Sequence, residues 1–394
     1  MRVRIALWGG SSSVILRVAQ RHCAFMLVSA RHVLTIPHTR EEPIDAAIDL
    51  HDVVKRYPRQ VYALQGINLQ VGRGEVFGLL GPNGAGKSTL VKIMMSVVRP
   101  TRAHGTILGH PVGHKPTLAR IGYLPENHRF PRYLTGGQVL NFFAALAKVG
   151  RSTRKRRSAE LLETVGMTPW ADAKISTYSK GMMQRIGIAQ ALVHDPDLVV
   201  LDEPTDGVDP VGRRDVLNIL GALRGKGKTV FINSHALSEL ESICDRVAIL
   251  VKGQVALQGT MDALTVARER YEIELVFDSR ADVVALRSQM LSAVGAQWNP
   301  PTPSPDGPID RGLLNGNLPI ERSGPVLRVT TNDPQIIQPI IDALRAAGLA
   351  IRRVQRMRPS LEDLFMSAVI DPATGRAVTP GASTQKLPPA RSGT

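Results

Sequence analysis

The sequence predicts an α/β protein with two folded regions, a larger domain over residues 46–265 and a smaller one over 268–370. The short apolar runs Leu198–Asp202 and Thr229–Ser234 are typical of strands that lie buried on both faces of a parallel sheet. After residue 268, strand-like and helix-like patterns alternate again over a shorter stretch, which indicates the second α/β domain.

The length and composition suit a folded chain with ample core. Of the 394 residues, 43% are hydrophobic and 21% are charged. No apolar run reaches the roughly 18 residues of a membrane-spanning helix, so we expect any role at a membrane to depend on a partner. The two cysteines, Cys23 and Cys244, lie far apart and without metal-ligand spacing, which favours inert thiols in a reducing cytosol.

The net charge of +15 calls for an acidic surface, which is nucleic acid, anionic lipid or an acidic partner. Aromatic residues make up only 4% of the chain and offer little for stacking on bases, so we expect no nucleic acid. An anionic membrane attracts each nearby Lys or Arg by about 1 kcal/mol and explains the charge equally well. The basic run Arg151–Arg157 contributes to such a surface or is a solvated loop before a helix.

Residues 1–45 open with a long stretch that lacks acidic residues and whose apolar groups are interrupted by Arg17 and Arg21. We expect a disordered extension here, or a start placed too early, with Met26 as the alternative beginning. The Arg- and Ser-rich composition also resembles an organelle transit segment, whereas a signal peptide fits poorly.

The larger domain begins with two alternating segments, 47–57 and 61–71, that predict antiparallel strands. A mostly helical stretch is expected over about 127–195, ahead of the two buried strands. A hairpin that turns at Lys252-Gly253 closes the domain.

The smaller domain carries its own helix signals. Asp333 before a proline predicts a helix N-cap, and Ser360–Asp363 predicts a capping box. The Pro-, Gly- and Asn-rich piece over about 299–324 is interpreted as a flexible insertion, and residues 371–394 as a disordered tail.

A glycine-rich loop follows the apolar segment "EVFGLL" in the larger domain. Glycines at Gly81, Gly84 and Gly86 let successive backbone N–H groups turn inward around an anion. The spacing G-x-x-x-x-G-K-S is the P-loop pattern, in which Lys87 reaches the β- and γ-phosphates and the Ser88 hydroxyl ligates Mg²⁺. The helix that starts near Lys87 directs its positive end at the same phosphates. A plain strand-to-helix turn does not need the Lys-Ser-Thr that follows.

Two adjacent carboxylates, Asp202 and Glu203, end the buried strand that precedes "PTDGVDP". Buried carboxylates are costly unless a cation is near, and Mg²⁺ on a nucleotide supplies one. Asp202 can hold the metal through water, while Glu203 points to the opposite side and can polarise the water that attacks the γ-phosphate. Either residue alone also fits an ordinary strand-to-loop exit.

With these motifs in order, residues 47–262 resemble the nucleotide-binding subunits of ABC transporters. The segment "YSKGMMQR", Tyr178–Arg185, is similar to the family signature, which in the family caps the γ-phosphate bound by the other subunit of a dimer. Ser179 and Gly181 match the signature. The departures are Tyr178, Lys180 and Met182. Lys180 adds a positive charge near the phosphate, and Met182 removes an amide.

The resemblance assigns four further residues. Tyr57, with Tyr62 as a rival, resembles the aromatic that stacks on adenine, and Asp209 matches the loop that crosses the dimer interface. His235 is similar to the switch histidine that contacts the γ-phosphate. Glu126 takes the place of a glutamine that senses Mg²⁺ and the attacking water, and a carboxylate there binds the metal more strongly.

The resemblance implies an ABC-type P-loop fold with an antiparallel β subdomain and a helical subdomain, and it implies ATP and Mg²⁺ as cofactors. The residues expected to contact nucleotide are Tyr57, Gly81, Pro82, Asn83, Gly84, Ala85, Gly86, Lys87, Ser88, Thr89, Glu126, Ser179, Gly181 and Asp209. Those expected to act in catalysis are Lys87, Glu203 and His235, and those expected to hold the metal are Ser88, Glu126 and Asp202.

The ending "RPSLEDLF", Arg358–Phe365, is similar to ATPase subunits of drug and lipid exporters whose permease is a separate chain. This likeness implies an ATPase that dimerises with itself or a related subunit and drives a permease from the cytoplasmic face of the membrane. The alternatives are a soluble ABC ATPase that acts on ribosomes or nucleic acid, and a non-catalytic nucleotide-dependent assembly module.

Overall fold

The computed structural model describes residues 45–58, 61–266, 269–276, 282–301 and 309–369. The predicted N-terminal extension except Asp45, the predicted tail and Cys23 all lie outside these ranges. None of the helices in the described ranges combines the length and the apolar character needed to cross a membrane.

The first domain opens with consecutive strands and then, over residues 121–251, alternates strands with helices as is typical of a parallel α/β sheet. Its strands are β1 (Ala46–Tyr57), β2 (Val61–Gly72), β3 (Val76–Leu80), β4 (Arg102–Ile107), β5 (His110–Pro111), β6 (Ile121–Leu124), β7 (Leu198–Asp202), β8 (Thr229–Asn233), β9 (Arg246–Val251) and β10 (Gln254–Thr260). Its α-helices are α1 (Lys87–Met94), α2 (Gly136–Leu146), α3 (Arg151–Thr164), α4 (Lys180–Leu192), α5 (Pro210–Gly225), α6 (Leu237–Ile243) and α7 (Met261–Val266).

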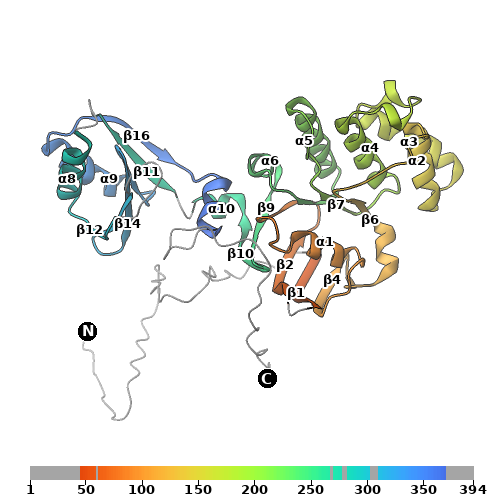
Figure 1. Ribbon diagram of the computed structural model, residues 1–394, viewed down its shortest axis with the longest axis horizontal. Helices are drawn as coiled ribbons and strands as arrows, with labels where there is room; N and C mark the ends of the chain where they lie inside the picture. Colours follow the sequence, from red (N-terminus) through yellow and green to blue (C-terminus); the bar gives the residue numbers. More distant parts are fainter. Residues whose placement is uncertain (1–44, 59–60, 267–268, 277–281, 302–308, 370–394) are drawn as a thin grey trace, which may run out of the picture. The chain divides into compact units, whose positions relative to one another are not determined.

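The central sheet has the order β10-β9-β3-β8-β7-β6, with parallel pairing throughout except at β9 and β10 (Figure 1). Every residue of β3, β7 and β8 is buried, which confirms the predicted two-sided strands. Successive side chains face opposite cores, with Val76 and Leu80 on one face and Phe77 and Leu79 on the other. The hairpin between β9 and β10 turns at Lys252 and Gly253, both with positive φ, as predicted.

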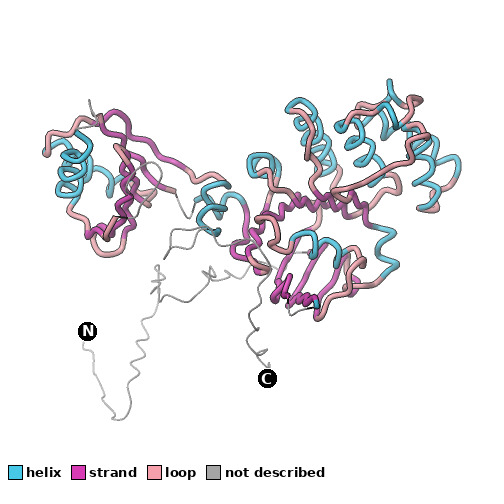
Figure 2. The backbone as a smooth tube through the Cα atoms, viewed as in Figure 1, coloured by secondary structure: helices cyan, strands magenta, loops and turns pink. Residues whose placement is uncertain are grey.

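A second sheet, β2-β1-β4-β5, is antiparallel and shares a core with α1 and one face of the central sheet (Figure 1). The predicted helical stretch contains α2, α3 and α4, which Figure 2 shows as a group of helices beyond β6. Thr135 caps α2 with the capping-box partner Gln138, and Ser179 caps α4. The basic run at Arg151 is the first half of α3, so it is helical and does not form a loop before a helix.

The C-terminal region contains β11 (Arg270–Leu275), α8 (Asp282–Val294), β12 (Gln297–Trp298), β13 (Ile309–Leu314), β14 (Leu318–Ser323), β15 (Val326–Val329), α9 (Pro334–Ala346), β16 (Ile351–Met357) and α10 (Leu361–Val369). Its sheet is antiparallel in the order β12-β13-β14-β15-β11-β16, and its core is separate from those of the first domain. The predicted caps at Asp333 and Ser360–Asp363 are present.

The prediction of a flexible insertion over about 299–324 is wrong for the residues described there. Residues 309–323 form β13 and β14, which pair in register around Asn315 and Gly316. Leu314 pairs with Leu318, so the loop has three residues, and its first two have positive φ of 51° and 78°, which Asn and Gly adopt more readily than other residues. The Pro- and Gly-rich composition hid an Asn-Gly turn between two strands.

The last helix predicted for the smaller domain, α10, packs instead on the first domain. Leu361 and Leu364 of α10 belong to the core of the first domain, where α10 packs against α6, β9 and α7. The apolar residues of α10 recur at helical spacing and form one face of the helix. This face packs on the first domain next to α6.

Candidate functional site

The predicted phosphate-binding loop joins β3 to α1 and needs glycine at two close approaches. A Cβ at Gly81 would lie 2.3 Å from the Leu250 carbonyl oxygen. A Cβ at Gly86 would lie 2.5 Å from the Ala63 carbonyl oxygen, and the φ of Gly86 is +109°. The loop is therefore pressed against β2 and β9, and residues with side chains are excluded at both positions.

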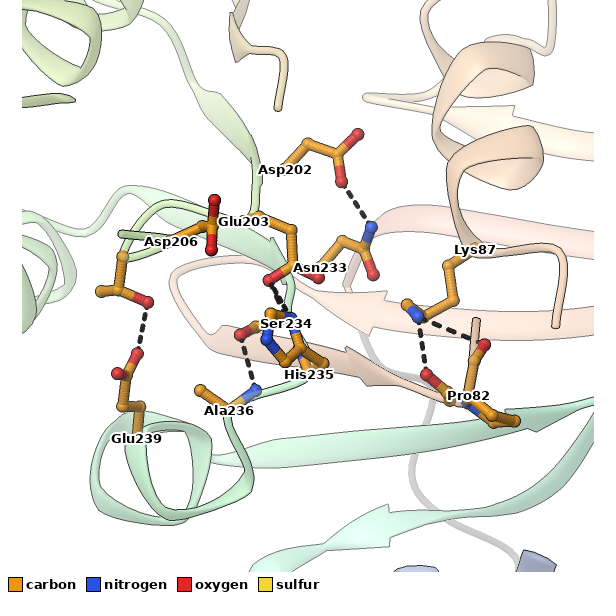
Figure 3. Close-up of polar contacts among 12 residues, drawn as sticks. Pro82, Lys87, Asp202, Glu203, Asp206, Asn233, Ser234, His235, Ala236 and Glu239 are labelled. Carbon is orange, nitrogen blue, oxygen red and sulfur yellow. Dashed lines mark hydrogen bonds and ion pairs between the residues drawn. The ribbon is translucent and has the colours of Figure 1, made fainter. Parts of the chain in front are cut away.

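Lys87, the first residue of α1, is 7% exposed and points back into the loop (Figure 3). Its Nζ donates to the carbonyl oxygens of Gly81 at 2.6 Å and Pro82 at 3.5 Å. Burial lowers the pKa of Lys87, and the nearby carboxylates, Glu203 first, oppose that shift. An added anion would favour the charged ammonium further, as a phosphate site requires.

The loop forms one wall of a cavity of about 540 Å³, a size typical of small-molecule sites. The lining combines the complete loop with four carboxylates, two other polar residues and four apolar side chains. The lining residues are Gly81 through Thr89, the acids Glu126, Asp202, Glu203 and Asp206, the polar residues Asn233 and His235, and the apolar residues Ala63, Leu80, Leu237 and Phe365.

Asp202 ends β7 beside Asn233, which ends the neighbouring parallel strand β8. It is 4% exposed and accepts a hydrogen bond of 2.5 Å from the Asn233 amide (Figure 3). Burial raises the pKa of Asp202, and the negative charges of Glu126 and Glu203 raise it further. The Asp202 carboxylate thus lies where a cation would stabilise its charged form.

The donor set around Asp202 fits a nucleotide-bound magnesium ion better than a metal held by protein alone. In the described ranges, no three His, Cys, Asp or Glu side chains are arranged to hold a metal. Asn233 Oδ1 is buried and has no hydrogen-bond partner among the described residues. Mg²⁺ typically uses one or two carboxylates, waters and substrate phosphates, and Ser88, Glu126 and Asp202 all line the cavity.

Glu203 occupies a strained position at the exit of β7. Its φ is +52°, a left-handed conformation that costs a residue with a side chain about 1–2 kcal/mol. Its backbone N–H donates to the Asn233 carbonyl oxygen at 2.8 Å, and its Oε2 lies 2.8 Å from His235 Nδ1 (Figure 3). The strain turns the Glu203 side chain toward His235, whereas Asp202 turns toward Asn233.

A second contact joins the loop after β7 to α6. Thr205 Oγ1 donates to Glu239 Oε2 at 2.5 Å, and Arg213 Nη1 lies 3.5 Å from Glu239 Oε1. Because α6 begins at Leu237, two residues after His235, these contacts fix the start of α6 relative to Glu203.

The predicted signature segment forms the N-terminus of α4. The Ser179 hydroxyl accepts from Met182 N at 3.2 Å, and Lys180 Nζ donates to Asp206 Oδ2 at 2.8 Å. Asp209 caps α5 by accepting from Gly212 N at 2.6 Å.

The cavity brings together the predicted loop residues with Glu126, Asp202, Glu203 and His235. It does not bring in Tyr57, Ser179, Gly181 or Asp209, which are absent from the described lining. Tyr57 lies at the end of β1, is 36% exposed and has Lys55 Nζ 4.9 Å from its ring centroid.

Sequence reasoning missed six residues of this lining, the apolar Ala63, Leu80, Leu237 and Phe365 and the polar Asp206 and Asn233. Asn233 has a usable signal, because it ends a strand predicted to lie in the same parallel sheet as Asp202. Asp206 sits inside the quoted segment "PTDGVDP". Phe365 has no local signal, because only the packing of α10 on the first domain brings it to the cavity.

Comparison with known proteins identifies the class that this loop, this sheet order and these acids define. The ABC transporter family matches residues 64–206. An ABC transporter ATP-binding protein of Synechocystis is 35% identical over 345 residues, which cover 85% of this chain and 88% of that protein. The daunorubicin resistance ATP-binding protein of Streptomyces coeruleorubidus is 33% identical, over 82% of this chain and 95% of that protein.

Solved structures agree with the relatives. An ABC transporter ATP-binding subunit superposes with a TM-score of 0.52 at 29% identity, over 56% of this chain and 92% of that one. A dimeric ATP-binding cassette in a post-hydrolysis state, bound to ADP and Pi, has a TM-score of 0.51 at 25% identity, over 54% of this chain and 98% of that one. The chain belongs to the ABC transporter ATP-binding family, whose members hydrolyse ATP.

Proposed function

We propose that the 540 Å³ cavity binds ATP with Mg²⁺ and hydrolyses it. The observation that carries the proposal is the convergence of Lys87, Asp202, Glu203 and His235 on one glycine loop. Lys87 would leave the loop carbonyls for the β- and γ-phosphates. Ser88, Glu126 and Asp202 would hold the metal, which neutralises phosphate charge during transfer.

Glu203 is the group we assign as general base. It would take a proton from the water whose oxygen attacks the γ-phosphorus, while the bond from that phosphorus to the β-phosphate oxygen breaks and ADP leaves. The bond from Glu203 to His235 Nδ1 orients the imidazole ring, and the second ring nitrogen would contact the γ-phosphate. The strained backbone of Glu203 keeps both side chains at the cavity.

We further propose that two ATPase subunits close around ATP and drive a separate permease chain that exports its substrate, at the cytoplasmic face of the membrane. Relatives named for drug resistance and for Nod factor, linearmycin and fluoroquinolone export or resistance support the export direction. The dimeric cassette structures support the closed pair, in which Ser179, Gly181 and Asp209 would face the partner's nucleotide. Tyr57, which is not part of the cavity lining, would stack on adenine.

The net charge of +15 is also compatible with the alternative, a soluble ABC ATPase that acts on ribosomes or nucleic acid. Fractionation of cells that express the chain separates these functions. Export predicts that the protein sediments with membranes and comes off with its permease, whereas the alternative predicts that it follows ribosomes.

The decisive experiment compares wild-type protein with Glu203→Gln for ATP turnover and ATP-dependent dimerisation. We expect the variant to lose about 10²-fold or more of its turnover, because a positioned base has been removed. It should nevertheless form a more stable dimer with ATP. Equal turnover in both proteins, or no dimer with ATP, would reject this function and favour a non-catalytic assembly module.

A further inference from the structure

Phe365 is the one cavity-lining residue, among those described, that comes from the C-terminal region of the chain. The other lining residues belong to the first domain and end at Leu237. Phe365 is half-buried and lies on α10, while the next residue, Met366, is 46% exposed. Phe365 therefore lines the nucleotide cavity, whereas its neighbour Met366 on the same helix is not part of the lining.

Packing fixes the position of α10 on the first domain. Leu361 and Leu364 are 0% and 1% exposed and share a core with Leu240 of α6 and Val247 of β9. Full burial of a leucine side chain contributes about 1.5–3 kcal/mol, so these two side chains hold the helix firmly. With Phe365 they form the helix face that is turned toward the first domain.

This face supports the segment that carries His235. Helix α6 has only seven residues, starts at Leu237 and has no side-chain cap at Ala236. Leu237 and Phe365 are both partly buried against the same core and both line the cavity. Since a short, uncapped helix has little stability of its own, its first turn depends on these apolar neighbours as well as on the contacts of Glu239 with Thr205 and Arg213.

The N-terminal end of α10 is also tied to the C-terminal sheet by charged contacts. Asp363, the capping-box residue of α10, lies 3.6 Å from the guanidinium of Arg270, the first residue of β11. Just ahead of α10, Arg358 donates to the buried Glu269 at 3.0 Å, and Arg356 of β16 binds the same carboxylate. A displacement of the sheet would thus reach α10 through these ion pairs.

We propose that Phe365 is a positioning residue for ATP hydrolysis and that α10 couples the C-terminal domain to the occupancy of the nucleotide cavity. This inference rests on the proposed ATPase function. The Phe365 ring supports Leu237 and, through it, the start of α6 and the loop that holds His235 against Glu203. ATP bound in the cavity then restricts α10, and a shift of the C-terminal sheet changes the position of His235.

Two variants of the full chain test the positioning role, Phe365→Ala and the matched control Met366→Ala. We expect Phe365→Ala to lower kcat about tenfold with little change in KM for ATP, because the phosphate loop is intact and only the reacting groups shift. Met366→Ala should keep the wild-type kcat. Phe365→Leu, which retains an apolar side chain, should recover most of the rate and shows that the fold is intact.

Amide hydrogen exchange tests the coupling and separates it from a merely structural role. It is measured on Glu203→Gln protein with and without Mg-ATP, and again with Phe365→Ala added. We expect ATP to slow exchange in residues 81–89 and in α10, and Phe365→Ala to abolish only the slowing in α10.

If ATP slows exchange in residues 81–89 and leaves α10 unchanged, the coupling is refuted while the ATP site stands. If ATP leaves residues 81–89 unchanged as well, the proposed function itself fails. Equal losses of kcat in Phe365→Ala and Met366→Ala would also overturn the positioning role.

Discussion

The substitution Gly86→Ala tests the claim that the phosphate loop is shaped by a close backbone contact. Gly86 has a φ of +109°, and a Cβ there would lie 2.5 Å from the Ala63 carbonyl oxygen and 2.8 Å from Leu64 Cδ2. The new methyl group must therefore push β2 and the loop apart. The loop lies between β3 and α1, so this movement also changes the wall of the nucleotide cavity.

The magnitude follows from three contributions to the free energy of unfolding. Positive φ costs an L-residue about 1–2 kcal/mol, and overpacking against a backbone oxygen adds about 1–3 kcal/mol. The reduced freedom of the unfolded chain returns about 0.4–1 kcal/mol. We expect Gly86→Ala to lower the free energy of unfolding by about 2–4 kcal/mol.

Gly109→Ala is the matched control. Gly109 also has a positive φ, +80°, but a Cβ there would meet no atom within 4 Å. Its expected loss is about 1 kcal/mol or less, because strain and unfolded-state entropy nearly cancel.

The assay for both variants is urea denaturation without nucleotide, followed by circular dichroism, together with the dissociation constant for ATP. We expect Gly86→Ala to unfold at a lower urea concentration than Gly109→Ala and to bind ATP at least about tenfold more weakly. Equal unfolding midpoints in the two variants would show that the contact with Ala63 does not constrain the loop, and would refute this reasoning.

Two further predictions concern the acids of the cavity. Asp206→Asn should tighten ATP binding a few-fold at low salt, since it removes a carboxylate from the lining and frees Lys180, and high salt should erase the gain; weaker binding by the variant would contradict this role. Burial raises the pKa of Asp202 in the folded chain, so its ionisation lowers stability as the pH rises from the ordinary Asp value through the raised one. Asp202→Asn should remove this decline in the nucleotide-free protein, which urea denaturation at several pH values would reveal. An identical pH dependence in both proteins would show that the buried charge of Asp202 does not destabilise the folded chain.

Much of the fold is predictable because its signals are local. The apolar runs of β7 and β8 specify strands buried on both faces, and the Asp333 cap marks the start of α9 within a residue. Residues 309–323 differ from the expected insertion because their Pro- and Gly-rich surroundings mask the turn dipeptide Asn315-Gly316, which is itself a local signal.

In the candidate site, too, some residues can be located from local sequence signals, whereas others require the positions of neighbouring strands. The loop from Gly81 to Thr89 is contiguous in sequence, so its residue types suffice to locate it. The pairing of Asp202 with Asn233 requires the neighbouring position of β7 and β8, which a strand-by-strand interpretation does not provide.

Local patterns cannot predict that Phe365 reaches the cavity. They predict the apolar face of α10, but they do not indicate which part of the protein that face packs against. The same face would fit the sheet of its own region, where we expected it, or the α6 side of the first domain, where it lies. Packing of Leu361 and Leu364 against Leu240 and Val247 places α10 on the first domain. As a consequence, the neighbouring Phe365 reaches the cavity. Catalytic motifs therefore locate the chemistry of this ATPase, whereas the residue that we propose to link it to the C-terminal domain becomes visible only in three dimensions.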